Sequence, residues 1–152
     1  MLQHRLARVS VFGGDRYDAF ISYSHAADGQ LAPAVQRGLQ RLAKPLFQVR
    51  AMRAFRDRTS LSANPALWPT IQRALEGSRF LILMASPAAA KSMWVGEEAA
   101  WWLANRDVNN LLLAVTEGEL AWDSGANDFD WVRTDCIPRC LERTFAHEPF
   151  WV

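Results

Sequence analysis

The feature that most constrains this chain is a run of consecutive apolar residues, Phe80-Leu81-Ile82-Leu83-Met84, which is closed by Ser86-Pro87. A strand with one face in water alternates apolar and polar residues, whereas a strand of a parallel sheet is covered on both faces and is apolar throughout. The run therefore predicts a buried strand over residues 79–85. Because parallel strands need long crossover connections, helices are expected before and after this strand.

Further strands and helices alternate along the sequence. β-Branched and aromatic residues predict strands at residues 18–24, 49–55, 111–115 and 149–152. Apolar residues at helical spacing predict helices at residues 31–42, 66–76, 92–105 and 135–145. The alternation predicts an α/β domain, in which a parallel sheet has helices on both faces.

The topology of such a sheet predicts where a ligand binds. In the five-strand order 2-1-3-4-5, the strand order reverses between the first and third strands, and ligands bind outside the carboxyl ends of the strands at such a point. The segment Tyr23-Ser24-His25 follows the first predicted strand, and Ser86-Pro87 follows the third. We therefore expect these two segments to meet at the functional site.

The composition agrees with one globular domain. The chain has 152 residues, of which 50% are hydrophobic and 22% are charged, which excludes a disordered chain. The formal net charge of +1 excludes a strongly cationic nucleic-acid binder. The apolar runs are too short to span a membrane, and no secretory signal follows Met1. These features predict a cytoplasmic protein without membrane or nucleic-acid partners.

Residues 1–16 are expected to form a flexible leader, and residues 17–152 the folded domain. The abrupt apolar end, Phe150-Trp151-Val152, suggests a module of a longer protein. Cys136 and Cys140 lie four residues apart in a predicted helix, a spacing that suits neither a disulfide nor a zinc site. Both thiols are expected to be buried or half-buried.

The predicted helix at residues 92–105 contains the most informative side chains. Trp94, Glu98 and Trp101 recur at intervals of four and three, so they share one face of the helix. A carboxylate between two indoles is partly desolvated, which raises its pKa and is typical of a functional site. The alternative is a surface helix with Glu98 at its solvated edge. Glu97 points about 100° away from Glu98 and provides a control for it.

Three motifs, in this order, resemble those of Toll/interleukin-1 receptor (TIR) domains, in particular bacterial ones. They are the strand Tyr17-Asp18-Ala19-Phe20-Ile21-Ser22-Tyr23-Ser24, then Phe55-Arg56-Asp57 with the loop after it, and then Leu83-Met84-Ala85-Ser86-Pro87 followed by Ser92-Met93-Trp94-Val95-Gly96-Glu97-Glu98. The resemblance covers residues 17–152. It implies a flavodoxin-like three-layer sandwich with five parallel strands in the order 2-1-3-4-5. One departure is Val95, where the family usually has cysteine.

The resemblance implies one of two activities. Many bacterial and plant TIR domains cleave NAD at the nicotinamide–ribose bond, whereas other members only assemble through contacts between TIR domains. The enzymes have a glutamate four residues after the helix tryptophan, which is Glu98 here. This favours an NAD glycohydrolase that releases ADP-ribose or a cyclic isomer, with Glu98 as its catalytic residue. A non-catalytic interaction module is the main alternative, and a nucleotide-binding domain with other chemistry is a third.

The other candidate residues would bind the substrate. The aromatic ones offer flat faces for nicotinamide or ribose, the serines offer polar contacts, and the arginines suit the pyrophosphate. They are Tyr23, Ser24, Trp94, Arg56, Arg58 and Ser86. NAD is the substrate in this hypothesis, so neither a cofactor nor a metal is expected.

Assembly is a second implication of the resemblance. Residues of the loop after the second strand often complete the site of a neighbouring copy, and loop 59–67 would be that loop. Clustering by a fused or separate sensor domain would then activate the enzyme, in the setting of bacterial anti-phage immunity.

Overall fold

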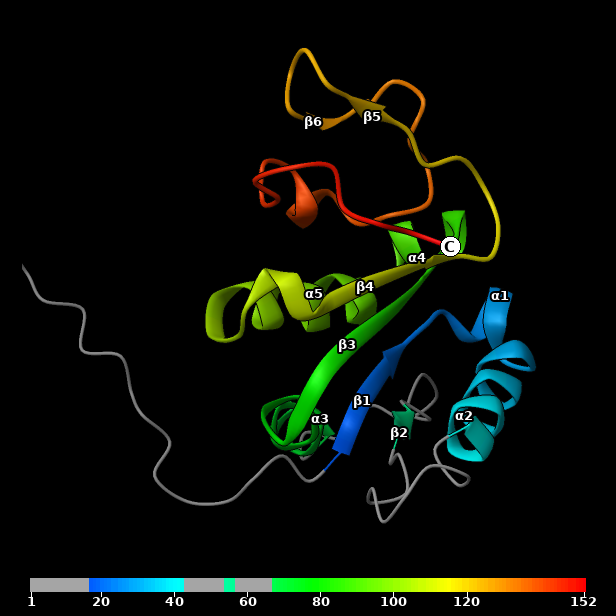
Figure 1. Cartoon of the computed structure of the whole chain (residues 1–152). Coiled ribbons are helices and arrows are strands. Elements are labelled where there is room, and N and C mark those ends of the chain that lie inside the picture. Colours follow the sequence, from blue (N-terminus) through cyan, green and yellow to red (C-terminus); the bar gives the residue numbers. More distant parts are fainter. Residues whose placement is uncertain (1–16, 43–53, 57–66) are drawn as a thin grey trace, which may run out of the picture.

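The computed structural model describes residues 17–42, 54–56 and 67–152, which form an α/β domain (Figure 1). The strands are β1 (Tyr17–Ser22), β2 (Ala54–Arg56), β3 (Ser78–Ala85), β4 (Leu111–Val115), β5 (Trp122–Asp123) and β6 (Asp128–Phe129). The α-helices are α1 (His25–Asp28), α2 (Leu31–Leu42), α3 (Leu67–Glu76), α4 (Pro87–Lys91) and α5 (Met93–Asn105). Two 3-10 turns, η1 (Val108–Asn110) and η2 (Arg139–Leu141), complete the described elements.

The main sheet has the strand order β2-β1-β3-β4, and each neighbouring pair is parallel. The apolar run that predicted a buried strand is β3, which lies between β1 and β4. The strand order reverses between β1 and β3, as predicted. Of the second predicted strand, residues 54 and 55 lie in β2, and residues 49–53 lie outside the described residues.

The predicted fifth strand is represented by a single contact. Trp151 forms an isolated parallel bridge with Leu113 of β4, and the N–H of Val115 donates to the carbonyl of Val152 at 2.7 Å. This contact lies on the free side of β4, where a fifth strand would continue the order. The five-strand sheet is therefore not confirmed as such.

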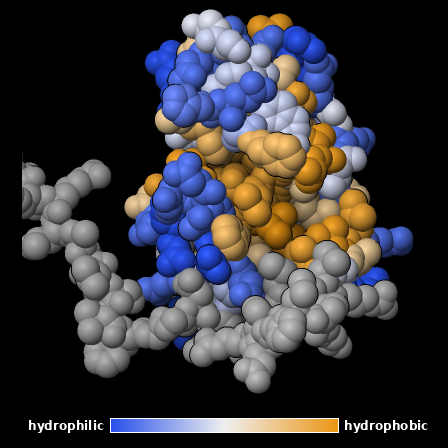
Figure 2. Space-filling model, in the orientation of Figure 1, coloured by the Kyte–Doolittle hydropathy of each residue, from blue (hydrophilic) through white to orange (hydrophobic). Residues whose placement is uncertain are grey.

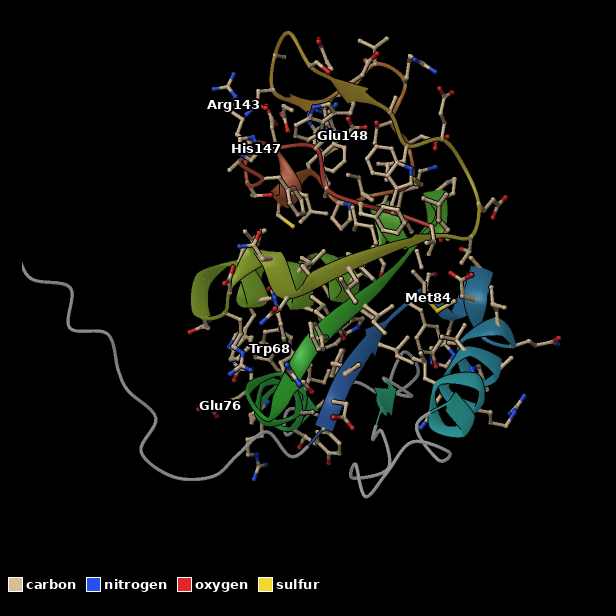
Figure 3. The ribbon with its side chains drawn as sticks, viewed as in Figure 1. Trp68, Glu76, Met84, Arg143, His147 and Glu148 are labelled. Atoms are coloured by element: carbon tan, nitrogen blue, oxygen red, sulfur yellow. The ribbon has the colours of Figure 1, made fainter. Side chains whose placement is uncertain are left out.

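Different helices cover the two faces of the sheet, because side chains alternate along each strand. On one face, α3 and α5 pack in a cluster that includes Phe20, Leu83 and Leu113. On the other face, α2 packs against Ile21 and Met84, and Figure 3 shows Met84 on the side of β3 toward α1 and α2. The prediction of helices on both faces is thus confirmed.

The α2 face of the sheet is only partly covered. Leu112 points to this face because its neighbour Leu113 points to the other, and it is 43% exposed. Trp151 pairs with Leu113, so Phe150 and Val152 share the face of Leu112, and both are exposed. Figure 2 shows hydrophobic residues gathered over the region of β3 and β4. This edge of the domain therefore presents an apolar surface.

The predicted helix at residues 92–105 is confirmed as α5, but the shorter helix α4 precedes it. The hydroxyl oxygen of Ser86 accepts from the N–H of Ala89 at 3.1 Å and caps α4. Pro87 stands in the first turn, where its missing N–H has no helical partner to lose. Ser92 caps α5 in the same way, through the N–H of Val95 at 3.4 Å. Two successive caps divide the segment into two helices.

The helix predicted at residues 135–145 is wrong. The segment is irregular apart from η2, and Pro138 precedes this turn in an extended conformation. Proline lacks an N–H, and its ring clashes with the carbonyl four residues earlier, so it interrupts a helical pattern. Cys136 and Cys140 therefore do not share a helix. Cys136 is buried, as predicted, whereas Cys140 is exposed.

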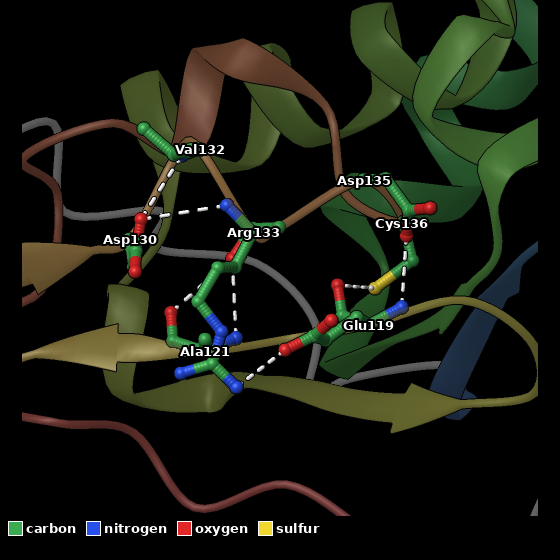
Figure 4. Close-up of polar contacts among 8 residues, drawn as sticks. Glu119, Ala121, Asp130, Val132, Arg133, Asp135 and Cys136 are labelled. Atoms are coloured by element: carbon green, nitrogen blue, oxygen red, sulfur yellow. Dashed lines mark hydrogen bonds and ion pairs between the residues drawn. The ribbon is translucent and has the colours of Figure 1, made fainter.

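Aromatic rings organise the C-terminal segment, residues 116–152. The ring of Phe129 has those of Trp122, Phe145 and Trp131 around it, with centroids 5.2, 5.7 and 5.8 Å away. β5 and β6 form a small antiparallel pair within this segment, in a stretch for which the sequence analysis predicted neither a strand nor a helix. Figure 4 shows the polar contacts beside the pair, including the thiol of Cys136, which donates to the carbonyl of Glu119 at 3.2 Å.

Candidate active site

Glu98 lies in the buried stripe of α5, together with Val95, Ala99 and Trp102. Its side chain is 1% exposed, whereas that of the adjacent Glu97 is exposed. The alternative that placed Glu98 at a solvated helix edge is therefore wrong. Burial removes water from a carboxylate at a large cost in free energy, so a glutamate at such a position is a candidate for function.

Ser22, the last residue of β1, is a partner of Glu98. Its hydroxyl donates to Oε2 of Glu98 at 2.5 Å, although the two residues are 76 positions apart in the sequence. Ser22 pairs with Leu83 of β3 and points to the same face of the sheet as Phe20. This is the face that α5 covers. The sequence contains no local signal for the contact, and the sequence analysis missed Ser22.

Trp94 lies one helical turn before Glu98 and is partly buried against the same core. Its ring centroid is 6.2 Å from that of Trp68, with the ring planes at 43°. Trp68 belongs to the first turn of α3, and Figure 3 shows it between α3 and α5. The crossovers from β2 to β3 and from β3 to β4 have the same hand and advance across the sheet in the same direction, which brings α3 and α5 onto one face. That rule is the only sequence-level signal that joins these two tryptophans.

Tyr23 lies at the same edge of the sheet as Ser22, but on the opposite face. It packs with Ile21 and Met84 on the face that α2 covers, and its hydroxyl is 3.2 Å from Nε2 of His25. Ser24 is buried directly after it, and its carbonyl accepts from the N–H of Asp28 at 2.8 Å. The structure therefore brings Glu98 and Trp94 together on the α5 side and places Tyr23 on the α2 side.

Ser86 is fully buried after β3, as the topology predicts, but its hydroxyl oxygen already caps α4. Arg56 ends β2, beside Ile21 in the parallel register. Arg58 and residues 59–66 of the predicted association loop lie outside the described residues. Leu67, the last residue of that loop as predicted, instead begins α3 and is buried in the core. Substrate contacts of these serine and arginine side chains stay predictions.

The loop after β4 packs over the carboxyl end of β3. The N–H of Thr116 donates to the carbonyl of Ala85 at 2.9 Å. Gly118 follows with φ +89°, and a Cβ there would lie 2.5 Å from Oδ1 of Asp135 and 3.1 Å from Cδ of Pro87. Glycine fits both the left-handed conformation and the close approach. This glycine therefore lets the loop press against the start of α4.

The carboxylate defines what this arrangement does chemically. An anionic oxygen in an apolar, water-poor setting accepts strong hydrogen bonds from ligand hydroxyls and stabilises positive charge that develops nearby. Indole rings one turn away offer flat surfaces for a heterocycle.

Two searches concern residues 17–42, 54–56 and 67–152 only. Within them, no three or more histidine, cysteine, aspartate or glutamate side chains are grouped to hold a metal ion. None of the helices there combines the length and the apolar content that a membrane span requires.

Comparisons with known proteins agree with the motifs. The TIR domain family matches residues 19–135 of this chain. The NAD(+) hydrolase ApTIR of Actinoplanes sp. (strain SE50/110) is 54% identical over 134 residues, which make up 88% of this chain and 19% of that protein. The TIR domains in the solved structure of the activated Roq1 resistosome, which directly recognises the pathogen effector XopQ, match at 18% identity and a TM-score of 0.49. That match covers 65% of this chain and 57% of that one.

The fold and the buried glutamate define an α/β domain with a candidate active site at the carboxyl edge of its sheet. The chain belongs to the TIR domain family, as the match over most of its length shows. It spans about a fifth of the length of the Actinoplanes protein that it matches.

Proposed function

We propose that this TIR domain is an NAD glycohydrolase, which cleaves the bond between nicotinamide and ribose. The observation that carries the proposal is Glu98, a carboxylate that is 1% exposed and lies one turn after Trp94, at the edge where strand order reverses. Open α/β sheets bind ligands at such an edge. The name of the Actinoplanes relative, NAD(+) hydrolase, supports the same activity at 54% identity.

The reaction needs one well-placed carboxylate. The bond between the anomeric carbon and the nicotinamide nitrogen breaks, and its electron pair neutralises the cationic ring nitrogen. The positive charge moves to the ribose, in a transition state that resembles an oxocarbenium ion. Water then bonds to the anomeric carbon and releases a proton, which gives ADP-ribose. No electrons are exchanged with a second reactant, so the proposal requires NAD as substrate and no cofactor.

Glu98 accepts hydrogen bonds from the hydroxyls of the nicotinamide-bearing ribose and stabilises the developing charge. Trp94 stacks against the nicotinamide, and Tyr23 contributes a second ring from the α2 side of the edge. Ser24 and Ser86 make polar contacts, and Arg56 and Arg58 bind the pyrophosphate. All of these contacts are part of the proposal.

The test is nicotinamide release from NAD by the purified chain at high concentration. Glu98→Ala should lower the rate by at least about a thousandfold, the size expected for loss of the main electrostatic contact. Glu97→Ala is the matched control, because Glu97 is adjacent in sequence but exposed, and it should change the rate by less than about twofold. Activity that survives Glu98→Ala would contradict the assignment.

The same assay separates the alternatives. No NAD turnover by the wild-type chain at any concentration would favour a non-catalytic TIR–TIR interaction module, and turnover of a different nucleotide would favour other chemistry. Chromatography of the products distinguishes ADP-ribose, formed when water attacks, from a cyclic isomer, formed when a group of the substrate attacks.

Assembly and context belong to the same proposal. The domain self-associates through loop 59–67, a fused or separate sensor domain activates it, and it acts in the cytoplasm in bacterial anti-phage immunity. A rate per molecule that rises with protein concentration is the expected sign of self-association. We also propose that a fifth strand beside β4 completes the order 2-1-3-4-5, and the parallel bridge between Trp151 and Leu113 supports this.

A further inference from the structure

Two polar side chains enter the apolar core between the sheet and α5, and they meet there. Ser22 lies on a face of the sheet that also contributes Phe20 of β1 and Leu81 and Leu83 of β3 to this core. Glu98 interrupts the apolar stripe of α5. Ser22 is 0% exposed and Glu98 is 1% exposed, and their hydrogen bond is 2.5 Å long.

Packing alone does not account for this pair. Replacing both partners of a buried hydrogen bond by apolar groups of the same shape is nearly neutral for stability, whereas leaving one partner without the other is costly. A fold that needed only stability at this place could use an alanine and a leucine. A serine that donates to a buried carboxylate is therefore coupled to what that carboxylate does.

We propose that Ser22 is a positioning residue for Glu98: its hydroxyl holds Oε2 and thereby fixes the orientation in which the carboxylate meets the ribose of the substrate. This inference rests on the proposed NAD glycohydrolase activity and deepens it. Ser22 acts through Glu98 and does not itself contact the substrate.

The placement of Ser22 suits this role. It is the last residue of β1, where the strand is still held by its pairing with Leu83 of β3, so the hydroxyl is fixed by the sheet. Glu98 belongs to a helix that packs on that sheet. A side chain on a strand supports a catalytic group more precisely than one on a loop does. The carboxylate is thus oriented before the substrate binds. This lowers the activation barrier, because the carboxylate does not have to be ordered during the reaction.

The experiment measures kcat and KM for NAD in wild type, Ser22→Ala and Ser22→Thr. Loss of a hydrogen bond to a charged group should lower kcat by about tenfold to a hundredfold. KM should change by less than about threefold, because the ground-state contacts of the substrate remain. Threonine keeps the hydroxyl group and is favoured in strands, so Ser22→Thr should recover most of the kcat that is lost in Ser22→Ala.

Ser78→Ala is the matched control. Ser78 is also a strand serine at 0% exposure, and its hydroxyl donates to the carbonyl of Ala74 at 2.7 Å. It lies at the opposite end of β3 from the partner of Ser22, roughly 16 Å along the strand. Ser78→Ala should lower the midpoint of thermal unfolding as Ser22→Ala does, and should leave kcat within about twofold.

The outcomes are distinguishable. Absence of NAD turnover in the wild-type chain overturns the proposed function, and this inference with it. Wild-type turnover with an unchanged kcat in Ser22→Ala overturns the inference alone. An equal loss of kcat in Ser22→Ala and Ser78→Ala also overturns it, because the effect would then follow stability. A raised KM at unchanged kcat would instead make Ser22 a substrate-binding residue and reject the positioning role.

Discussion

Two of the buried carboxylates in the described part of the chain, Glu98 and Asp128, have opposite surroundings. Glu98 sits in the apolar stripe of α5, with the hydroxyl of Ser22 on Oε2. Asp128 sits in the C-terminal segment, where Oδ2 accepts from Nε1 of Trp131 at 2.9 Å and Oδ1 accepts from the N–H of Arg143 at 3.0 Å. Figure 3 shows Arg143 at the edge of that segment.

The pKa of Asp128 shows what its surroundings do. Burial alone would raise it, but the hydrogen bonds from the N–H of Arg143 and the indole of Trp131 outweigh that effect, and the pKa lies below its ordinary value. N–H donors around a carboxylate stabilise the charged form in the folded state. Asp128 therefore serves the structure, as a fixed acceptor that ties β6 to Trp131 and to the backbone of Arg143. Glu98 lies instead beside the buried apolar residues of α5, and the hydrogen bond from Ser22 comes from a hydroxyl and not from an N–H group.

The largest expected effect is on NAD turnover, which should depend on Glu98 and not on Asp128. Glu98→Gln keeps the shape of the side chain but removes its charge, and should lower kcat for NAD by at least about a thousandfold, or about 4 kcal/mol of transition-state stabilisation. Its free energy of unfolding should stay equal or rise, because a neutral amide is less costly to bury than a carboxylate. Urea unfolding and steady-state kinetics of the same sample test both statements. A Glu98→Gln variant that is inactive because it is unfolded would remove the contrast.

The two cysteine thiols provide a second contrast, in which the expected effect on the thiolate fraction is about a hundredfold. Burial and the neighbouring Asp135 raise the pKa of the Cys136 thiol to about 11, so its thiolate fraction at pH 8 is about a hundredfold below that of an ordinary thiol. Partial desolvation of the sulfur and the charge of Glu97 raise the pKa of Cys140 as well. The residue as a whole is nevertheless exposed, with its sulfur 3.7 Å from the carbonyl of Gly96.

Iodoacetamide at pH 8 should therefore label Cys140 in the folded chain and reach Cys136 only when the C-terminal segment opens. Mass spectrometry of tryptic peptides over time measures the two rates. Cys140→Ser serves as the control, since it should leave a folded chain that is nearly unreactive. Equal rates at the two cysteines would show that the C-terminal segment is not packed as described.

Asp128→Asn should lower the free energy of unfolding by about 1–3 kcal/mol, the cost of disturbing a buried group that accepts two N–H bonds. NAD turnover of the folded variant should stay within about twofold of wild type, in contrast to Glu98→Gln. Because the pKa of Asp128 is lower in the folded state than in the unfolded chain, its contribution is fully present above the unfolded value and is lost as the pH falls through the folded value.

The difference in stability between wild type and Asp128→Asn should thus be constant from pH 7 to about pH 5 and should shrink below about pH 4. Urea titrations at several pH values measure it. A difference that grew as the pH fell would have the wrong sign for a stabilised carboxylate.

The smallest effect concerns the helix that holds Glu98. Gly96 lies inside α5, and a Cβ there would have no atom within 4 Å. Gly96→Ala should raise the free energy of unfolding by about 0.5–1 kcal/mol, because alanine is the better helix former. If NAD turnover stays unchanged, no ligand needs this glycine for close approach. A large loss of turnover would place the substrate directly over the first turn of α5.

Much of the domain was predictable because its signals are local. The apolar run of β3 predicts a strand covered on both faces, and the spacing of Leu67, Ile71 and Leu75 predicts the buried side of α3. The spacing of Trp94 and Glu98 places them one turn apart on the same face of a helix, and this holds in any tertiary fold. The strand order 2-1-3-4-5 was implied by the resemblance to TIR domains, and its first four positions match β2-β1-β3-β4.

The failures have equally local causes. A helix was predicted at residues 135–145 from apolar periodicity, but Pro138 within it is extended, cannot donate a helical hydrogen bond and disfavours the preceding turn. Helix α4 was missed because its five residues are too few to show an apolar periodicity. These errors affect the description of connections more than that of the core.

The amino-acid sequence by itself determined the alternation of strands and helices, the helix face that contains Glu98 and the motifs of the TIR family, because each depends on residues within a few turns of one another. Only the tertiary structure decided that Ser22 meets Glu98, that Trp68 meets Trp94, and that Tyr23 lies on the opposite side of the sheet edge. These contacts join residues far apart in the chain. They depend on strand register and on the packing of α3 and α5, which no local pattern encodes, since the free energy that selects them comes from burying the whole core at once.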